Sequence, residues 1–100
     1  MTAFQDPSSG PNEVSVNFDQ PASLRKWPSY AGKRLADPTG PYLIVATSLG
    51  ECIREYMARP AAMRHLYEIH TTEQPPLVTS VLTGAIVVAL ARLRNASGQN

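Results

Sequence analysis

Residues 77–94 read LVTSVLTGAIVVALARLR and form the most apolar stretch of the chain. Apolar side chains recur along it at the spacing of one helical face, and further apolar residues fill the neighbouring faces. Pro75 and Pro76 stand just before it and suit the first turn of a helix, where a backbone N–H is not needed. The stretch therefore predicts a helix that is apolar on most of its circumference and must be buried on most of it.

This predicted helix carries more apolar surface than the thin core of a 100-residue chain easily covers. Ser80, Gly84 and Ala91 add a narrow strip of small side chains, which lets two helix backbones approach closely. Packing within one protomer would also bury such a strip, but the apolar circumference favours a second copy. We therefore expect a homodimer through the C-terminal helix, with this interface: Leu82, Gly84, Ile86, Val88, Leu90 and Leu93.

Two more helices are predicted ahead of this stretch. Residues 41–59, PYLIVATSLGECIREYMAR, place apolar side chains on one broad face and polar side chains on the other. Gly50 weakens this helix by about 1 kcal/mol relative to alanine, which indicates close packing at that position. Pro60 ends the helix and can begin the next one, over residues 60–71. The expected fold class is therefore all-α, with three main helices in a small helical bundle.

The first 22 residues differ in character from the rest of the chain. A cluster of proline, serine and glycine interrupts regular structure early in them. Val14, Val16 and Phe18 then alternate with polar residues, as in a strand. Because no second strand is predicted to pair with them, we expect an extended or disordered N-terminal arm over residues 1–22. The remaining residues, 23–100, are expected to form a single small helical domain.

The composition limits the partners and the compartment. A formal net charge of +1 lacks the concentrated positive field of nonspecific nucleic-acid binding, so no direct nucleic-acid contact is expected. Cys52 is the single cysteine and cannot form an internal disulfide, which favours a reducing, cytoplasmic setting. The start of the chain has no signal-peptide pattern. The apolar stretch before Arg92 is shorter than the roughly twenty residues that span a bilayer, so no membrane association is expected.

The side chains capable of chemistry form no recognisable catalytic motif. Cys52, His65, Glu68 and His70 are the conceivable metal ligands. On a helix the two histidines would point about 140° apart, and two ligands on one face do not make a zinc site. Cys52 lies on the apolar face of its predicted helix, where a small buried thiol is expected. No metal, cofactor, cofactor-binding residue or catalytic residue is therefore expected, and the protein is predicted not to be an enzyme.

Trp27 and Tyr30 stand among four basic residues. Aromatic side chains that lie between basic residues can stack on the bases of single-stranded nucleic acid. Four basic residues in a nearly neutral chain are few for that role. We expect both aromatic side chains to anchor their segment onto the core instead.

Two runs of sequence resemble a known class of bacterial regulators. These runs are YLIVATSLGECIREYMARPAAMRHLYEIH, residues 42–70, and PPLVTSVLTGAIVVALARLRN, residues 75–95. They are similar to the small quorum-sensing antiactivators. The resemblance implies a protein–protein inhibitor that binds a LuxR-type transcription activator, at a LasR-like ligand-binding domain, and blocks its dimerisation and DNA binding.

The supply of apolar surface agrees with such a role. The predicted helices over residues 41–59 and 60–71 carry more aromatic and methionine side chains than the C-terminal helix can shield, and protein interfaces enrich these types. Arginines at the rim would set orientation more than affinity. The expected partner-binding surface consists of Arg54, Tyr56, Met57, Arg59, Met63, Leu66 and Tyr67.

Two other functions stay open. A small DNA-binding transcriptional regulator would need a recognition helix rich in exposed polar and basic residues. Residues 60–71 offer only Arg64, with Arg59 just before them. A small-molecule binder or enzyme subunit would instead use a pocket near Tyr56, Tyr67 and His70.

Overall fold

The computed structural model describes residues 15–36 and 38–96, in which strands and helices are interleaved. The elements, in chain order, are β1 (Pro21–Lys26), β2 (Ser29–Tyr30), β3 (Lys33–Arg34), β4 (Tyr42–Ser48), α1 (Leu49–Ala58), the 3-10 helix η3 (Ala61–Leu66), β5 (Tyr67–Thr71), β6 (Val81–Leu82) and α2 (Gly84–Ala96). The all-α expectation is therefore wrong. The described chain has a mixed α/β fold, with an antiparallel sheet at its centre.

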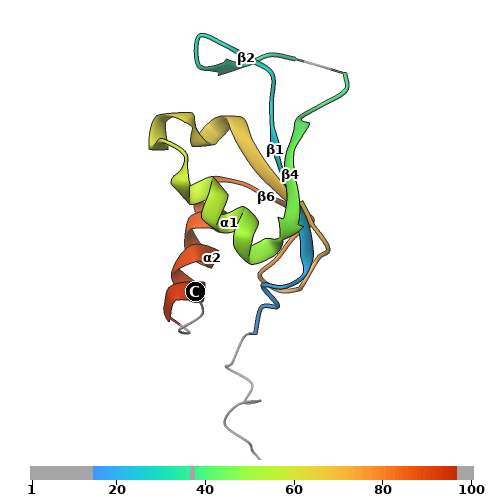
Figure 1. Cartoon of the computed structure of the whole chain (residues 1–100), viewed down its shortest axis with the longest axis vertical. Helices are drawn as coiled ribbons and strands as arrows, with labels where there is room; N and C mark the ends of the chain where they lie inside the picture. The colour runs from blue at the N-terminus through green and yellow to red at the C-terminus, as the bar shows by residue number, and fades with distance from the viewer. Residues whose placement is uncertain (1–14, 37, 97–100) are drawn as a thin grey trace, which may run out of the picture.

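The main sheet of the described chain has four antiparallel strands in the order β4-β1-β5-β6 (Figure 1). β1 is a central strand, on which Leu24 pairs with Val45 of β4 and with Ile69 of β5. Residues directly opposite one another share a face of the sheet, so these three side chains form one apolar row. β2 and β3 form a separate hairpin that projects away from the helices in Figure 1.

The helices cover one face of the sheet. α1 packs on β1 and β5, and α2 lies beside α1 (Figure 1). Tyr56 of α1 is 1% exposed, and its hydroxyl accepts a hydrogen bond of 3.0 Å from the backbone N–H of Gly84, which joins α1 to the start of α2. The buried core comprises Phe18, Ala22, Leu24, Leu49, Cys52, Ile53, Tyr56, Ile69, Val78, Leu82, Val87 and Leu90.

The predicted helix over residues 41–59 is a strand in its first part. The sequence YLIVATS, rich in aromatic and β-branched residues, suits a pleated strand and forms β4. α1 begins after Ser48, whose side-chain oxygen accepts a hydrogen bond of 3.2 Å from the backbone N–H of Glu51. A serine followed three residues later by a glutamate is the spacing of a capping box, a local signal for a helix start.

We expect Ser48→Ala to lower the free energy of unfolding by about 1 kcal/mol, because the N–H of Glu51 loses its acceptor. Thr47→Ala is the control, since this neighbouring residue is exposed and does not cap the helix. Urea unfolding measures both. Equal losses from the two substitutions would contradict the capping role.

Residues 60–71 also depart from the predicted helix. α1 ends before Pro60, as expected, but a short 3-10 helix follows and the last residues join the sheet as β5. Successive side chains of a strand point to opposite faces, so Ile69 faces the core while Glu68 and His70 face the other side. The side chains of Tyr67–Thr71 therefore alternate with the period of two of a strand, and not with the period of 3.6 of a helix.

The most apolar stretch of the chain, residues 77–94, is not one helix but is divided at Gly84. Val81–Leu82 forms β6 and pairs with β5, and α2 begins only at Gly84. Gly84 has a φ of +48°, in the left-handed region that the interior of a right-handed helix excludes. The helix is therefore shorter than predicted, and Leu82 enters the core as a strand residue.

The predicted arm over residues 1–22 is described only from residue 15 onward. Phe18 is 7% exposed and belongs to the core. Its carbonyl oxygen accepts a hydrogen bond of 2.8 Å from the N–H of Gly50. Residues 15–22 therefore pack on the folded body, and Val14, the first residue of the expected strand, lies outside the described residues.

Cys52 lies in the core with 0% exposure, which confirms the prediction of a buried thiol. Burial raises the pKa of this thiol from its ordinary value near 9 to about 11. The folded chain therefore keeps a proton that the unfolded chain releases in this range.

Stability should consequently fall as the pH rises from about 9 to about 11, by up to about 2–3 kcal/mol from this group. Cys52→Ala is the control, because it removes the thiol and retains every other titratable side chain. The variant is expected to lose less stability over that range than the wild type. Parallel pH profiles in urea unfolding would contradict the assigned pKa.

Candidate functional site

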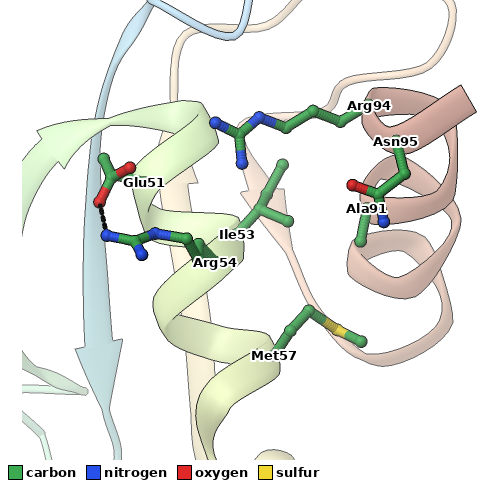
Figure 2. A pocket seen from close by; sticks show the side chains of 7 residues that line it. All are labelled: Glu51, Ile53, Arg54, Met57, Ala91, Arg94 and Asn95. Atoms are coloured by element: carbon green, nitrogen blue, oxygen red, sulfur yellow. Dashed lines mark hydrogen bonds and ion pairs between the residues drawn. The ribbon is translucent and has the colours of Figure 1, made fainter. Parts of the chain in front are cut away.

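A groove of about 480 Å³ lies between α1 and α2 (Figure 2). α1 and α2 both contribute apolar side chains to it, and charged or amide side chains lie beside them. Such a combination accepts a group that has an apolar part and a polar end. The α1–α2 groove is lined by Glu51, Ile53, Arg54, Met57, Ala91, Arg94 and Asn95.

The lining of the groove carries two positive charges, from its two arginines, and one negative charge, from its glutamate, so its net charge is +1. Arg54 Nη2 lies 2.8 Å from Glu51 Oε1, and this hydrogen bond is the main cause that lowers the pKa of Glu51. The Arg54 side chain is 66% exposed, so the ion pair contributes little to stability. The ion pair holds the Arg54 guanidinium against Glu51, on the side of α1 away from α2 (Figure 2).

Arg94 reaches from α2 toward the first turn of α1 (Figure 2). Its guanidinium packs over Gly50, where an added Cβ would lie 3.1 Å from Arg94 Nε. This contact confirms the close packing predicted at Gly50. The positive charge of Arg94 also lowers the pKa of Glu51. The missing side chain at position 50 thus allows α2 to place a cation at one end of the groove.

The groove brings together two of the predicted partner-binding residues, Arg54 and Met57. It adds three residues of α2 that were not assigned to the partner-binding surface: Ala91, Arg94 and Asn95. Sequence patterns assigned the C-terminal helix to dimerisation alone. The signal that points to Arg94 is Gly50, but its partner becomes visible only once the two helices are placed side by side.

The other predicted partner-binding residues do not form one surface. Tyr56 and Leu66 are 1% and 0% exposed, so neither side chain can contact a partner. Arg59 stacks on Tyr67, with its guanidinium carbon 5.2 Å from the ring centroid. Met63 is 36% exposed on η3, outside the groove lining. The expected surface is therefore divided between the groove, the aromatic stack, the exposed side of η3 and the interior.

The predicted dimer interface is divided as well. Leu82 and Leu90 are 0% and 3% exposed and belong to the core. The other four residues are exposed or half-buried: Gly84, Ile86, Val88 and Leu93. A second, wholly apolar hollow of about 260 Å³, the α2 hollow, is lined by Leu77, Ile86, Ala89, Leu90 and Leu93.

A polar cluster occupies the other face of the sheet. Glu68 is 6% exposed; its Oε1 accepts a hydrogen bond of 2.8 Å from Trp27 Nε1, and its Oε2 lies 2.6 Å from His70 Nε2. Trp27 therefore anchors its segment to the sheet face opposite the core, and not onto the core as expected. Tyr30 does not anchor it, because it is 77% exposed in the β2–β3 hairpin.

The potential metal ligands do not converge. Within residues 15–36 and 38–96, no group of three or more histidine, cysteine, aspartate or glutamate side chains could hold a metal ion. Cys52 is in the core, whereas Glu68 and His70 lie on the sheet face away from Ile69.

The fold does not form the sites that the two alternative functions require. Tyr67 and His70 are three residues apart on β5 and so point to opposite faces, and the pocket expected between them and Tyr56 does not form. Residues 60–71, the segment considered as a recognition helix for the DNA-binding alternative, are a 3-10 helix followed by an inner strand of the sheet. They cannot enter a major groove as an α-helix.

No family model matches the chain, and neither a curated protein nor a solved structure matches it. In the part of the chain that the structure describes, none of the helices has the length and hydropathy required to cross a bilayer. The function is therefore inferred from the α1–α2 groove and from the resemblance of residues 42–70 and 75–95 to the antiactivators.

Proposed function

We propose that this protein is a cytoplasmic, non-enzymatic protein–protein inhibitor that binds a LuxR-type transcription activator and blocks its dimerisation and DNA binding. The observation that supports binding is the α1–α2 groove, whose lining combines Arg54 and Arg94 with Met57 and other apolar side chains. Arginine and methionine are enriched at protein interfaces. The sequence resemblance supplies the class of partner.

The chemistry of the groove defines the segment that it would accept. Arg54 and Arg94 suit a carboxylate, because guanidinium groups form strong charge-assisted hydrogen bonds with that group. Met57 is flexible and adapts to an irregular apolar surface. The bound segment is therefore a helix or loop of the activator's ligand-binding domain with an acidic residue beside apolar ones. Capture of a segment that the activator uses for its own dimer would separate that dimer.

We expect Met57→Asp to weaken binding of the activator's ligand-binding domain about tenfold or more, because it removes apolar contact and repels the partner's carboxylate. Met63→Asp is the matched control, since Met63 is exposed and lies outside the groove lining. Titration calorimetry measures both affinities, and circular dichroism verifies that both variants are folded. A weaker Met63→Asp complex beside a normal Met57→Asp complex would place the partner elsewhere.

A further inference from the structure

β4 is an open edge of the main sheet. It stands at one end of the strand order and, among the described residues, pairs only with β1 (Figure 1). Its outer edge therefore presents backbone N–H and C=O groups that a further strand can bind. Natural edge strands are protected by charged residues, proline or bulges. β4 has one bulge, at Ile44, and its sequence YLIVATS contains neither a charged residue nor a proline.

The side chains of β4 are typical of an inner strand and not of an edge. Tyr42, Leu43 and Ile44 are 48%, 51% and 38% exposed. Because successive side chains of a strand point to opposite faces, β4 exposes apolar side chains on both faces of the sheet. A continuous apolar run of this kind is found in strands that have a neighbour on each side. A strand added at the outer edge would shield these side chains from water.

Lys26 places a positive charge next to this edge. On β1 it lies directly opposite Tyr42 of β4 and Tyr67 of β5, and its ammonium is 5.9 and 6.0 Å from the centroids of the two rings. Lys26 is half-buried, donates to Ser29 Oγ at 3.4 Å and forms no ion pair within the described residues. A partly desolvated ammonium without a carboxylate partner is unusual, and a carboxylate from a bound segment would pair with it.

The other accessible charges around this edge have the same sign. Arg25 precedes Lys26 on β1, and the hairpin that follows contributes Lys33–Arg34. The sequence has one acidic residue between positions 20 and 50, Asp37, which lies outside the described residues. On β5, Glu68 is buried and already bonded to side chains of its own cluster. Charge complementarity therefore favours an acidic partner strand.

We propose that β4 binds an extended acidic segment of a partner protein, which adds to the main sheet as a further strand and places a carboxylate beside Lys26. Neighbouring strands lie about 4.8 Å apart, so the added strand is one spacing beyond Tyr42, over whose ring the Lys26 ammonium lies. In this mode of recognition, backbone hydrogen bonds supply affinity and side chains supply specificity. The site shares no residue with the lining of the α1–α2 groove, and the inference is independent of the proposed function.

Fluorescence anisotropy with the full chain tests the proposal. The probe is a fluorescein-labelled peptide of seven residues, the length of β4, in which valine and glutamate alternate. We expect saturable binding with a dissociation constant below roughly 100 µM at low salt. Two control peptides should bind about tenfold more weakly or worse: one has lysine in place of glutamate, and one has a central proline, which cannot donate to the ladder. The absence of saturable binding at roughly 1 mM acidic peptide would overturn the proposal.

Substitution of Lys26 tests the position of the carboxylate. Lys26→Gln should weaken binding of the acidic peptide about tenfold or more, because the carboxylate loses its cation. Arg92→Gln is the matched control: it also removes one positive charge, but from an exposed position of α2. Circular dichroism verifies that both variants are folded. A Lys26→Gln protein that binds the acidic peptide as tightly as the wild type would contradict the proposed site.

Hydrogen exchange followed by NMR shows where the peptide lies without any substitution. The amide protons of β4 that point away from β1 should exchange more slowly in the complex, because they donate to the peptide. Slower exchange confined to α1 and α2 would overturn the proposal. A free protein that sediments as a dimer with these β4 amides already protected would overturn it as well, since a second copy would then occupy the edge.

Discussion

Leu24→Ala is expected to lower the free energy of unfolding by about 3–4 kcal/mol, among the largest losses for a single side chain of this protein. Leu24 is fully buried on β1, between Val45 and Ile69 of the two flanking strands. Its truncation removes apolar burial and leaves a cavity between the sheet and α1, and both effects destabilise the fold. Urea unfolding monitored by circular dichroism measures the loss.

Leu43→Ala provides the same substitution at an exposed position of the sheet. Leu43 is 51% exposed on β4, and its truncation should cost less than about 1 kcal/mol. The comparison also distinguishes the observed fold from the three-helix bundle expected from sequence, in which Leu24 lies outside all three helices. Similar small losses from both substitutions would contradict the central position of β1.

Glu68→Ala is expected to cost about 1–3 kcal/mol, because it leaves two part-buried hydrogen-bonding groups, Trp27 Nε1 and His70 Nε2, without their partner. The Glu68 carboxylate accepts from Trp27 Nε1 at 2.8 Å and lies 2.6 Å from His70 Nε2. Trp27 fluorescence should also change, because the indole loses its fixed position on the sheet.

Two substitutions serve as controls for this cluster. Glu73→Ala removes an exposed carboxylate and should change stability by less than about 0.5 kcal/mol. Glu68→Gln retains an oxygen acceptor for Trp27 and should fall between the wild type and Glu68→Ala. A Glu68→Ala protein as stable as the wild type would show that the cluster does not hold the segment.

Apolar periodicity predicted buried positions better than it predicted the elements that carry them. Val78, Leu82 and Leu90 were expected on one or another face of a single helix, and all three are buried. Residues 77–94 would bury nearly the same side chains as one continuous helix as they do in the observed arrangement, a strand followed by a helix that begins at Gly84. The apolar pattern therefore could not distinguish the continuous helix from the observed arrangement. The left-handed Gly84 decides between them, and its conformation depends on the chain around it.

The strands were missed because each depends on a partner that is distant in sequence. β4 pairs with β1, and Val45 is opposite Leu24, about twenty residues earlier. Local signals could have divided the first predicted helix, since Ser48 and Glu51 form a capping-box pattern after a β-branched run. The β2–β3 hairpin turns at Ala31 and Gly32, both with positive φ, and alanine gives little indication of such a turn.

In the candidate site, too, residues with a local sequence signal were predicted, and residues placed by tertiary packing were not. Arg54 and Met57 were predicted from the amphipathic pattern of their own segment, and both line the groove. Arg94 and Asn95 could not be predicted, because their place depends on α2 packing beside α1. Tyr56 and Leu66 were assigned to the surface because the sheet that buries them was not foreseen.

The proposed inhibition is tested most directly by the mass of the activator, loaded with its acyl-homoserine lactone, as this protein is added. Light scattering should show the activator dimer replaced by a complex that contains activator monomer, and a DNA shift assay should show release of its DNA. Met57→Asp at the same concentration should leave both largely unchanged. An activator that stays dimeric and DNA-bound at saturating inhibitor, or DNA shifted by this protein alone, would contradict the proposed function.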